Sequence, residues 1–235
     1  METINRGHMK VKLVSFTVPC TDELPLDSDV LDLIAFCARV SNPSNQTNTE
    51  TSDKLIKYLV KWKHWSPFEM ANATLEIETT RDIARQILRH RSFTFQEFSQ
   101  RYADPVKDLS FEYREARLQD TKNRQNSIVT DDRELHKEWL RVQQDVIRAS
   151  KNAYQWAINN GIAKEVARAV LPEGLTASRM YVNGTIRSWI HYIDIRSDVA
   201  TQKEHREIAM ACAKAIAEIF PMITEFTHAE ENRSE

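Results

Sequence analysis

The sequence predicts an α+β protein in which a central β-sheet packs against several long helices. Short segments that alternate apolar and polar residues are interspersed among longer segments with helical periodicity, and no internal repeat occurs. The chain has 235 residues, of which 41% are hydrophobic and 28% charged, so it is long enough to bury a sizeable core. We therefore expect one domain over residues 1–235, with loose termini at 1–9 and 228–235.

Period-two alternation identifies the strands. In the segment Thr74–Thr79, for example, Leu75 and Ile77 are placed on one face and polar residues on the other. The segment 93–102 has a β-type composition and is expected to be extended until Ala103-Asp104-Pro105 ends it. The expected strands or extended segments are 10–18, 74–79, 93–102 and 175–182.

Helices are expected where apolar residues recur every three to four positions and where start and stop residues flank them. Thr80 and Thr185 are expected N-caps, and Gly161 is an expected helix stop. Ser66, with Pro67 after it and Glu69 three residues on, predicts a capping box. The expected helices are 27–40, 51–62, 81–91, 131–160, 163–171, 186–196 and 201–220. The polar segment 108–130, which has little periodicity, is expected to be a surface excursion.

Composition excludes several classes of protein. A net charge of −2 argues against a general nucleic-acid coat, and the absence of a long apolar run argues against a membrane span. The chain has only four glycines, so neither a dinucleotide-binding G-x-G-x-x-G turn nor a phosphate-binding G-x-x-x-x-G-K-[ST] loop is present. The three cysteines are far apart and fit no metal-ligand spacing, which predicts reduced thiols, a cytoplasmic location and no metal site.

Arginines are concentrated between residues 81 and 101, which favours binding of a small anion. Gln86 and Arg89 are three residues apart and would share a helix face. If the following segment is extended, Glu97, Ser99 and Arg101 point the same way. Arginines of this kind suit phosphates, and the other polar groups suit a ribose or a base. The alternatives are a solvated arginine face, or Ser99 as a hydrolase nucleophile, although Ser99 lies in no G-x-S-x-G elbow.

Four ordered sequence blocks then match one family. Arg89-His90-Arg91, seven further residues and Ser99 match the signature R-H-R-x7-S of the flavin-dependent thymidylate synthases. The chain resembles that family over roughly residues 30–220. The other matching blocks are Ala38-Arg39-Val40-Ser41, His64-Trp65-Ser66-Pro67-Phe68-Glu69, and the C-terminal segments Arg168–Pro172 and Arg187–Arg196.

This resemblance implies a homotetramer with active sites between subunits, each holding FAD and dUMP side by side. It implies reductive methylation of dUMP to dTMP, with 5,10-methylenetetrahydrofolate and NADPH as co-substrates. The positions matching FAD contacts are Ser41, His64, Ser66, Glu69, Arg89, His90, Arg91, Glu97, Arg187 and His191. The positions matching dUMP contacts are Gln86, Arg89, Glu97, Ser99, Gln100, Arg101, Arg168 and Arg196.

Arg196 and Ser99 are the residues expected nearest the chemistry. Cysteine-dependent thymidylate synthases use a thiol in a motif that no cysteine of this chain occupies, so uracil needs another means of activation. Arg196 could stabilise negative charge that develops on the ring, and Ser99 is expected to contact dUMP and not to attack it. We expect the segment from Arg168 to Arg196 to supply the second half of the site across a subunit boundary.

Two residues depart from the pattern of many relatives. Thr185 and His191 stand where relatives have asparagine, and the connection 173–184 is one residue longer than in some of them. These departures concern the flavin contacts of the C-terminal half.

Two other readings remain open from the sequence. One is a nucleic-acid-binding module in which the aromatic residues of this region stack on bases: Phe93, Phe95, Phe98 and Tyr102. The other is a family member that has lost catalysis, against which the intact signature argues.

Overall fold

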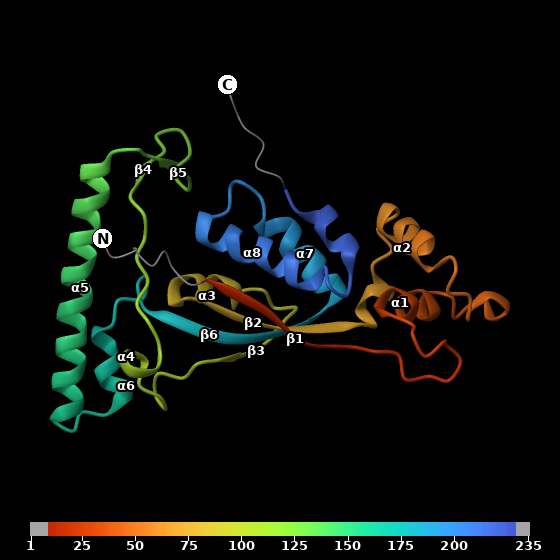
Figure 1. The fold of residues 1–235 in the computed structure, drawn as a ribbon, viewed down its shortest axis with the longest axis horizontal. Coiled ribbons are helices and arrows are strands. Elements are labelled where there is room, and N and C mark those ends of the chain that lie inside the picture. The colour runs from red at the N-terminus through yellow and green to blue at the C-terminus, as the bar shows by residue number, and fades with distance from the viewer. Residues whose placement is uncertain (1–8, 229–235) are drawn as a thin grey trace.

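A four-stranded antiparallel sheet forms the centre of the computed structural model, which describes residues 9–228 (Figure 1). The strands lie in the order β1-β2-β6-β3, so the last strand in the sequence lies between two earlier ones. Their bounds are Lys10–Phe16 for β1, Asn72–Thr80 for β2, Thr94–Glu97 for β3 and Ala177–Thr185 for β6. The architecture confirms the α+β prediction.

One face of this sheet is apolar and buried. Leu75 lies opposite Val182 and Ile77 opposite Met180 across the β2–β6 pair, and all four side chains are fully buried. Residues between them in β2 and β6 are half-buried or exposed, as expected for an antiparallel sheet with one solvated face.

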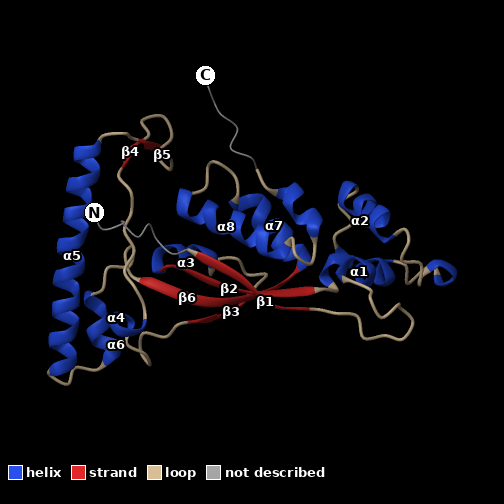
Figure 2. Ribbon diagram, in the orientation of Figure 1, coloured by secondary structure: helices blue, strands red, loops and turns tan. Residues whose placement is uncertain are grey.

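The helices that follow β2 and β6 in the chain cover the buried face (Figure 2). They are α3 (Arg81–Ile87), α7 (Ile186–Arg196) and α8 (Lys203–Ile216). Thr185 caps α7, since its hydroxyl oxygen accepts a hydrogen bond from the backbone N–H of Ser188 at 3.1 Å, as the sequence predicts. The expected helix 201–220 is shorter, because the chain turns after α8 and continues as a 3₁₀ helix, η4 (Pro221–Phe226).

At one end of the sheet lie α1 (Val30–Ala38), α2 (Ser52–Lys61) and the 3₁₀ helices η1 (Pro43–Asn45) and η2 (Ser66–Glu69). A capping box is present at the start of α1, where Asp29 and Asp32 bond each other's backbone N–H groups. The capping box predicted at Ser66 is wrong. The segment forms one 3₁₀ turn without a side-chain cap, and Glu69 pairs with Arg187 instead.

The longest helix, α5 (Arg133–Asn159), stands on the other flank of the molecule (Figure 1). It packs on α6 (Lys164–Ala167) and the adjoining 3₁₀ helix η3 (Arg168–Val170), and Tyr154 and Ala167 form part of a second small core. Gly161 ends this helical segment with a φ of 76°, which confirms the predicted stop, since a left-handed conformation suits glycine.

The segment 108–130 contains more structure than its composition indicates. It follows the short α4 (Pro105–Asp108) and includes a hairpin of β4 (Arg117–Gln119) and β5 (Ser127–Val129). Before the hairpin, Arg114 pairs with Asp82 at 2.8 Å, and both Arg114 and Arg117 pair with Glu204. Burial opposes ionisation of Glu204, but the two guanidinium groups outweigh it and lower the pKa of Glu204 to about 2.

The residues that the structure describes include no helix long and apolar enough to cross a membrane. Most of the loose termini expected at 1–9 and 228–235 lies outside the described range. His228, at its edge, contacts Asp194.

Candidate active site

The Arg89-His90-Arg91 segment lies in the turn between α3 and β3. Helix α3 ends at Ile87, earlier than expected, so Arg89 is beyond the helix and does not share a helical face with Gln86. Phe93 anchors the far end of the turn. Its side chain is 5% exposed, and its ring centroid lies 4.5 Å from that of Trp189.

Arg196 contacts this turn within the same chain. Its Nε donates a hydrogen bond of 2.9 Å to Nε2 of His90. Burial lowers the pKa of His90 to about 4, and the nearby charges of Arg196, His191 and Arg89 add to the effect. His90 is therefore neutral at pH 7 and can accept this bond. The expectation that Arg196 belongs to the half of the site opposite the Arg-His-Arg turn is wrong, because α7 and α3 pack on the same face of the sheet.

Gln86 faces the interior between α3 and α8. His205 donates from Nδ1 to the Gln86 Oε1 at 3.1 Å, and Gln86 donates from Nε2 to Gln202 Oε1 at 2.8 Å. His205 is fully buried, and burial, with the charges of Arg196 and His90, lowers its pKa to about 3. Sequence reasoning missed Gln202 and His205. The sequence did contain a signal for His205, because it is a polar residue on the face of α8 that is otherwise apolar and includes Ile208.

Glu97, at the end of β3, lies among cations. Arg81 and Arg85 lie 3.6 Å and 3.7 Å from its two carboxylate oxygens, and Ser178 donates a 2.9 Å hydrogen bond to it. The carboxylate is thus held by α3 and by the central strand β6. Its orientation is fixed within the chain.

Ser99, Gln100 and Arg101 do not continue the alternation of β3. The strand stops at Glu97, and the backbone carbonyl of Ser99 accepts bonds from Tyr102 and Ala103, which closes a turn. The predicted common direction of Glu97, Ser99 and Arg101 is therefore wrong. Within residues 9–228 no hydrogen bond reaches the Ser99 hydroxyl, so it has no base of the kind a hydrolase nucleophile needs.

The same turn brings Arg101 near Arg168. Arg101 lies 3.6 Å from the Glu165 carboxylate, and Arg168 donates to the Glu165 backbone carbonyl at 3.3 Å. Gln100 is 4% exposed, and its Nε2 has no partner among the described residues. A buried amide N–H₂ without an acceptor in the chain is available to a bound molecule.

The remaining candidates lie toward the α1–α2 end and on the solvent side of α7. Arg187 forms an ion pair with Glu69, and His191, four residues later, is exposed on the same face of α7. Ser41, His64 and Ser66 are exposed in the loops around η1 and η2. The hydrogen bonds and ion pairs of the described residues therefore sort the candidates into groups around His90, Glu97, Glu165 and Glu69.

Arg89 and Arg91 could neutralise a phosphate. Both are exposed, and the structure records no acidic partner for either side chain in the described part of the chain. Guanidinium groups bind phosphate with paired N–H donors, and the chain has no glycine loop to do so. These residues therefore fit a cofactor with a diphosphate, such as FAD.

A separate cavity of about 440 Å³ lies away from these groups. It is lined from the end of β2, the segment 112–117, α5 and α8, and by none of the candidate site residues. The donor set of the arginine groups fits anionic ligands, whereas the charges of the cavity are largely paired with one another, so the arginine groups are the stronger candidate site.

Stacking of bases on the aromatic residues is not supported. Phe93 is buried and Phe95 packs against the core, so Tyr102 is the most exposed ring of the four, at 86%. No cluster of potential metal ligands occurs among residues 9–228.

Comparisons with known proteins identify the family of the chain. The family model described as "Thymidylate synthase complementing protein" (Thy1) matches residues 26–222. The chain is 48% identical over 218 residues to a "Flavin-dependent thymidylate synthase" of Synechocystis sp., covering 92% of this chain and 97% of the relative. It is 46% identical over 215 residues to a "Probable flavin-dependent thymidylate synthase" of Paramecium bursaria Chlorella virus 1, with the same coverage.

A solved structure supports the fold. The UMP/dUMP methylase PolB from Streptomyces cacaoi superposes with a TM-score of 0.78 and 25% sequence identity, covering 94% of this chain and 95% of that one.

The fold and the arginine-rich site define an enzyme of thymidylate synthesis. The glycine-poor sequence separates it from enzymes that bind a dinucleotide in a glycine-rich loop. The chain belongs to the Thy1 family: it is a flavin-dependent thymidylate synthase, a methyltransferase that uses FAD, NADPH and methylenetetrahydrofolate to form dTMP.

Proposed function

We propose that this enzyme binds dUMP and FAD together between the Arg89-His90-Arg91 turn and segments supplied by other subunits of a homotetramer. The observation that carries the proposal is the 2.9 Å bond from Arg196 to His90, because it joins a candidate substrate residue to a candidate cofactor residue within one chain. The other groups, around Glu165 and Glu69, complete the site from neighbouring chains.

The substrate side consists of polar side chains with free hydrogen-bonding capacity. The unpartnered amide of Gln100 and the exposed hydroxyl of Ser99 lie in one turn with Arg101, and Arg168 lies close by. Arginines suit the dUMP phosphate, and an amide and a hydroxyl suit its sugar and base. We assign these residues, with Gln86, Arg89, Glu97 and Arg196, to dUMP.

The cofactor side consists of exposed polar residues in loops and on α7. Arg89 and Arg91 supply cationic donors for the diphosphate, and neutral His90 supports the turn that bears them. We assign FAD to this turn together with Glu97 and with Ser41, His64, Ser66, Glu69, Arg187 and His191. When bound and reduced by NADPH, the flavin supplies the hydride that completes the methyl group.

Arg196 activates the pyrimidine in this proposal. Its guanidinium is half-buried at the end of α7 and bonded to neutral His90, and no ion pair with a carboxylate is recorded for it within residues 9–228. A preorganised cation in a partly desolvated site stabilises negative charge as it develops on a substrate. Ser99 contacts dUMP in this arrangement and remains uncharged.

The family-level chemistry can be checked by the colour of the enzyme. Purified protein should be yellow, and its flavin absorbance should bleach when NADPH is added without oxygen. Adding dUMP and methylenetetrahydrofolate to the bleached enzyme should form dTMP. A colourless protein that FAD does not reconstitute would contradict the proposed cofactor site.

We further propose that residues 1–235 act as one domain and that the enzyme works in the cytoplasm. All three cysteines are unpaired, and burial raises the pKa values of Cys37 and Cys212, so these two are inert thiols suited to a reducing compartment.

A further inference from the structure

A row of hydrogen bonds connects the candidate substrate residue Gln86 to a buried carboxylate. Helices α3 and α8 pack on the same face of the sheet, which places Gln86 beside the start of α8 (Figure 1). Gln86 Nε2 donates to Gln202 Oε1 at 2.8 Å, and Gln202 Nε2 donates to Glu204 Oε2 at 3.0 Å. On its other side, Gln86 Oε1 lies 3.1 Å from Nδ1 of His205. We call these four residues the amide relay.

Glu204 determines the direction of the relay at one end. Arg117 donates to its Oε1 at 2.7 Å, and Arg114 lies 3.2 Å from its Oε2. Burial favours the neutral carboxyl, but the two guanidinium groups outweigh it and lower the pKa of Glu204 to about 2, so this group is ionised at pH 7. A carboxylate only accepts hydrogen bonds. The neighbouring Gln202 must therefore turn its N–H₂ group toward Glu204 and its oxygen toward Gln86.

The same orientation passes on to Gln86. Because Gln202 presents an oxygen, Gln86 must present its N–H₂ group there and its own oxygen to His205. The reverse orientation of Gln86 would place two amide oxygens against each other, and no hydrogen bond could form between them. His205 is then the donor of the last bond, so its neutral ring carries the proton on Nδ1.

His205 favours the same direction from the other end of the relay. The side chain is fully buried, burial lowers its pKa to about 3, and its Nε2 has no partner among the described residues. In a reversed relay, Nδ1 would accept from Gln86 and the proton would lie on Nε2. That buried N–H would then have no acceptor within residues 9–228, which costs free energy. Both ends of the relay therefore select one orientation of the Gln86 amide.

The oriented amide of Gln86 offers one donor and one acceptor to a ligand. A primary amide has two N–H donors and an oxygen with two lone pairs, and the relay uses one of each. Gln86 is half-buried, so its remaining groups can reach a substrate. Turning the amide over would exchange the donor and the acceptor where dUMP meets them. Polar groups of the substrate would then be left unpaired, which weakens binding.

We propose that Glu204 and Gln202 are positioning residues that fix the orientation of the Gln86 amide for the binding of dUMP. The inference rests on the proposed function, because it takes Gln86 as a dUMP contact. Neither positioning residue needs to touch the substrate. Their effect is carried by the direction of the hydrogen bonds, so it depends on whether residue 202 donates to Gln86 or accepts from it.

Two substitutions at residue 202 test this dependence. Gln202→Glu accepts from Gln86 and keeps its amide in the wild-type orientation, whereas Gln202→Lys can only donate, so the amide must turn over. We expect Gln202→Lys to raise the KM for dUMP about tenfold, the effect of one lost hydrogen bond, and Gln202→Glu to change it less than about twofold. The kcat should change little in either variant, because the contact is made in the ground state and in the transition state.

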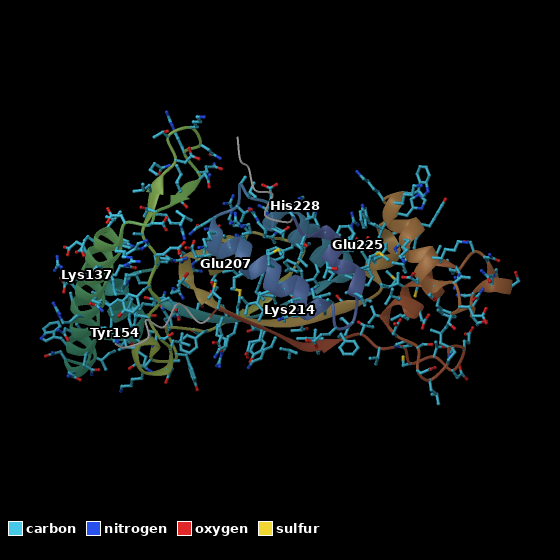
Figure 3. All side chains as sticks on the ribbon, turned by 45° about the horizontal axis from the view of Figure 1, so that its top comes forward. Lys137, Tyr154, Glu207, Lys214, Glu225 and His228 are labelled. Carbon is cyan, nitrogen blue, oxygen red and sulfur yellow. The ribbon has the colours of Figure 1, made fainter. Side chains whose placement is uncertain are left out.

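The stability of these two variants should follow the opposite order. A lysine beside Glu204 gains an attractive charge pair, whereas a glutamate there places like charges side by side. Urea unfolding should therefore show Gln202→Lys to be the more stable variant, and a purely structural role of Gln202 predicts that it is also the more active one. The matched control is Lys214→Glu, which changes the charge of an exposed position on the same helix (Figure 3) and should keep the wild-type KM.

The tautomer of His205 reports the direction of the relay in the unaltered enzyme. In the flavin-bound protein with ¹⁵N-labelled histidine rings, the resonances that disappear in His205→Asn should show the proton on Nδ1. In Gln202→Lys the proton should move to Nε2. A proton on Nε2 in the wild-type enzyme would overturn the proposed direction, whatever the stability of the variants.

Gln86→Leu separates this inference from the proposed function. If the KM for dUMP stays at the wild-type value in Gln86→Leu, the contact of Gln86 with dUMP and the role of the relay are both overturned. If it rises there, but the two variants at residue 202 have equal values or Gln202→Glu has the higher one, the positioning role alone is overturned. Flavin absorbance recorded on the same samples reports separately on the cofactor site.

Discussion

At the scale of single residues, Arg196 is the side chain whose charge matters most. We expect Arg196→Ala to lower turnover by about 10²-fold or more, the size of effect seen when one stabilising donor is removed from an active site. Binding of dUMP should weaken far less, because other arginines hold the phosphate. Turnover and dUMP binding should be measured separately by rapid quench and calorimetry. Wild-type turnover in a variant that still binds dUMP would exclude this role.

His205 makes stability depend on pH. The unfolded chain protonates this imidazole near pH 6.5, whereas the folded protein does so only near pH 3, so stability is lost as pH falls through this window. For this buried group we expect a loss of about 2 kcal/mol between pH 7 and pH 5. His90, with a pKa of about 4, acts in the same direction.

The variant His205→Asn isolates this contribution. Asparagine can still donate to Gln86 but does not titrate, so the slope of unfolding free energy with pH should become shallower. Urea unfolding at pH 5, 6 and 7 measures it. An unchanged slope would mean that His205 does not control the pH response.

At the scale of elements, contact between β6 and the turn after α3 positions the Arg-His-Arg segment. A Cβ added at Gly184 would lie 2.2 Å and 2.4 Å from ring atoms of buried Phe93. We expect Gly184→Ala to destabilise the protein by about 1–3 kcal/mol and to reduce flavin retention, because Phe93 must move and His90 with it. Denaturant unfolding and the flavin content of the purified protein measure both effects.

Gly174→Ala is the matched control, since its nearest contact would be 3.9 Å away, from Asp82. It should change stability by less than about 0.5 kcal/mol. Equal effects of the two substitutions would show that the close approach at Gly184 does not hold the turn.

At the scale of the whole molecule, shared active sites predict that two inactive variants complement each other. Arg168→Ala changes the group around Glu165, and Arg196→Ala changes the group around His90, and these two groups are held by separate contacts in the described part of the chain. If these groups meet across subunits, mixing the variants under exchange should restore up to about a quarter of wild-type activity by random assembly. The control mixes Arg196→Ala with Arg89→Ala, which act on the same side and should stay inactive. Failure of both mixtures would place the site within a single chain.

The sequence by itself determined the fold class, most strands and helices, and the family. Leu75 and Ile77 are buried, as the alternation of apolar and polar residues predicted. Thr185 caps a helix and Gly161 ends one, as predicted, because such signals depend on residues that are neighbours in the chain. The signature around Arg89 identified the family through residues close together in sequence.

Only the tertiary structure decided how the candidates are grouped. The end of α3 at Ile87, the turn at Ser99 and the bond from Arg196 to His90 depend on packing between segments about 100 residues apart, which local periodicity does not encode. Side-chain burial is a property of the assembled fold, and it separates a residue that packs from one that is free to bind.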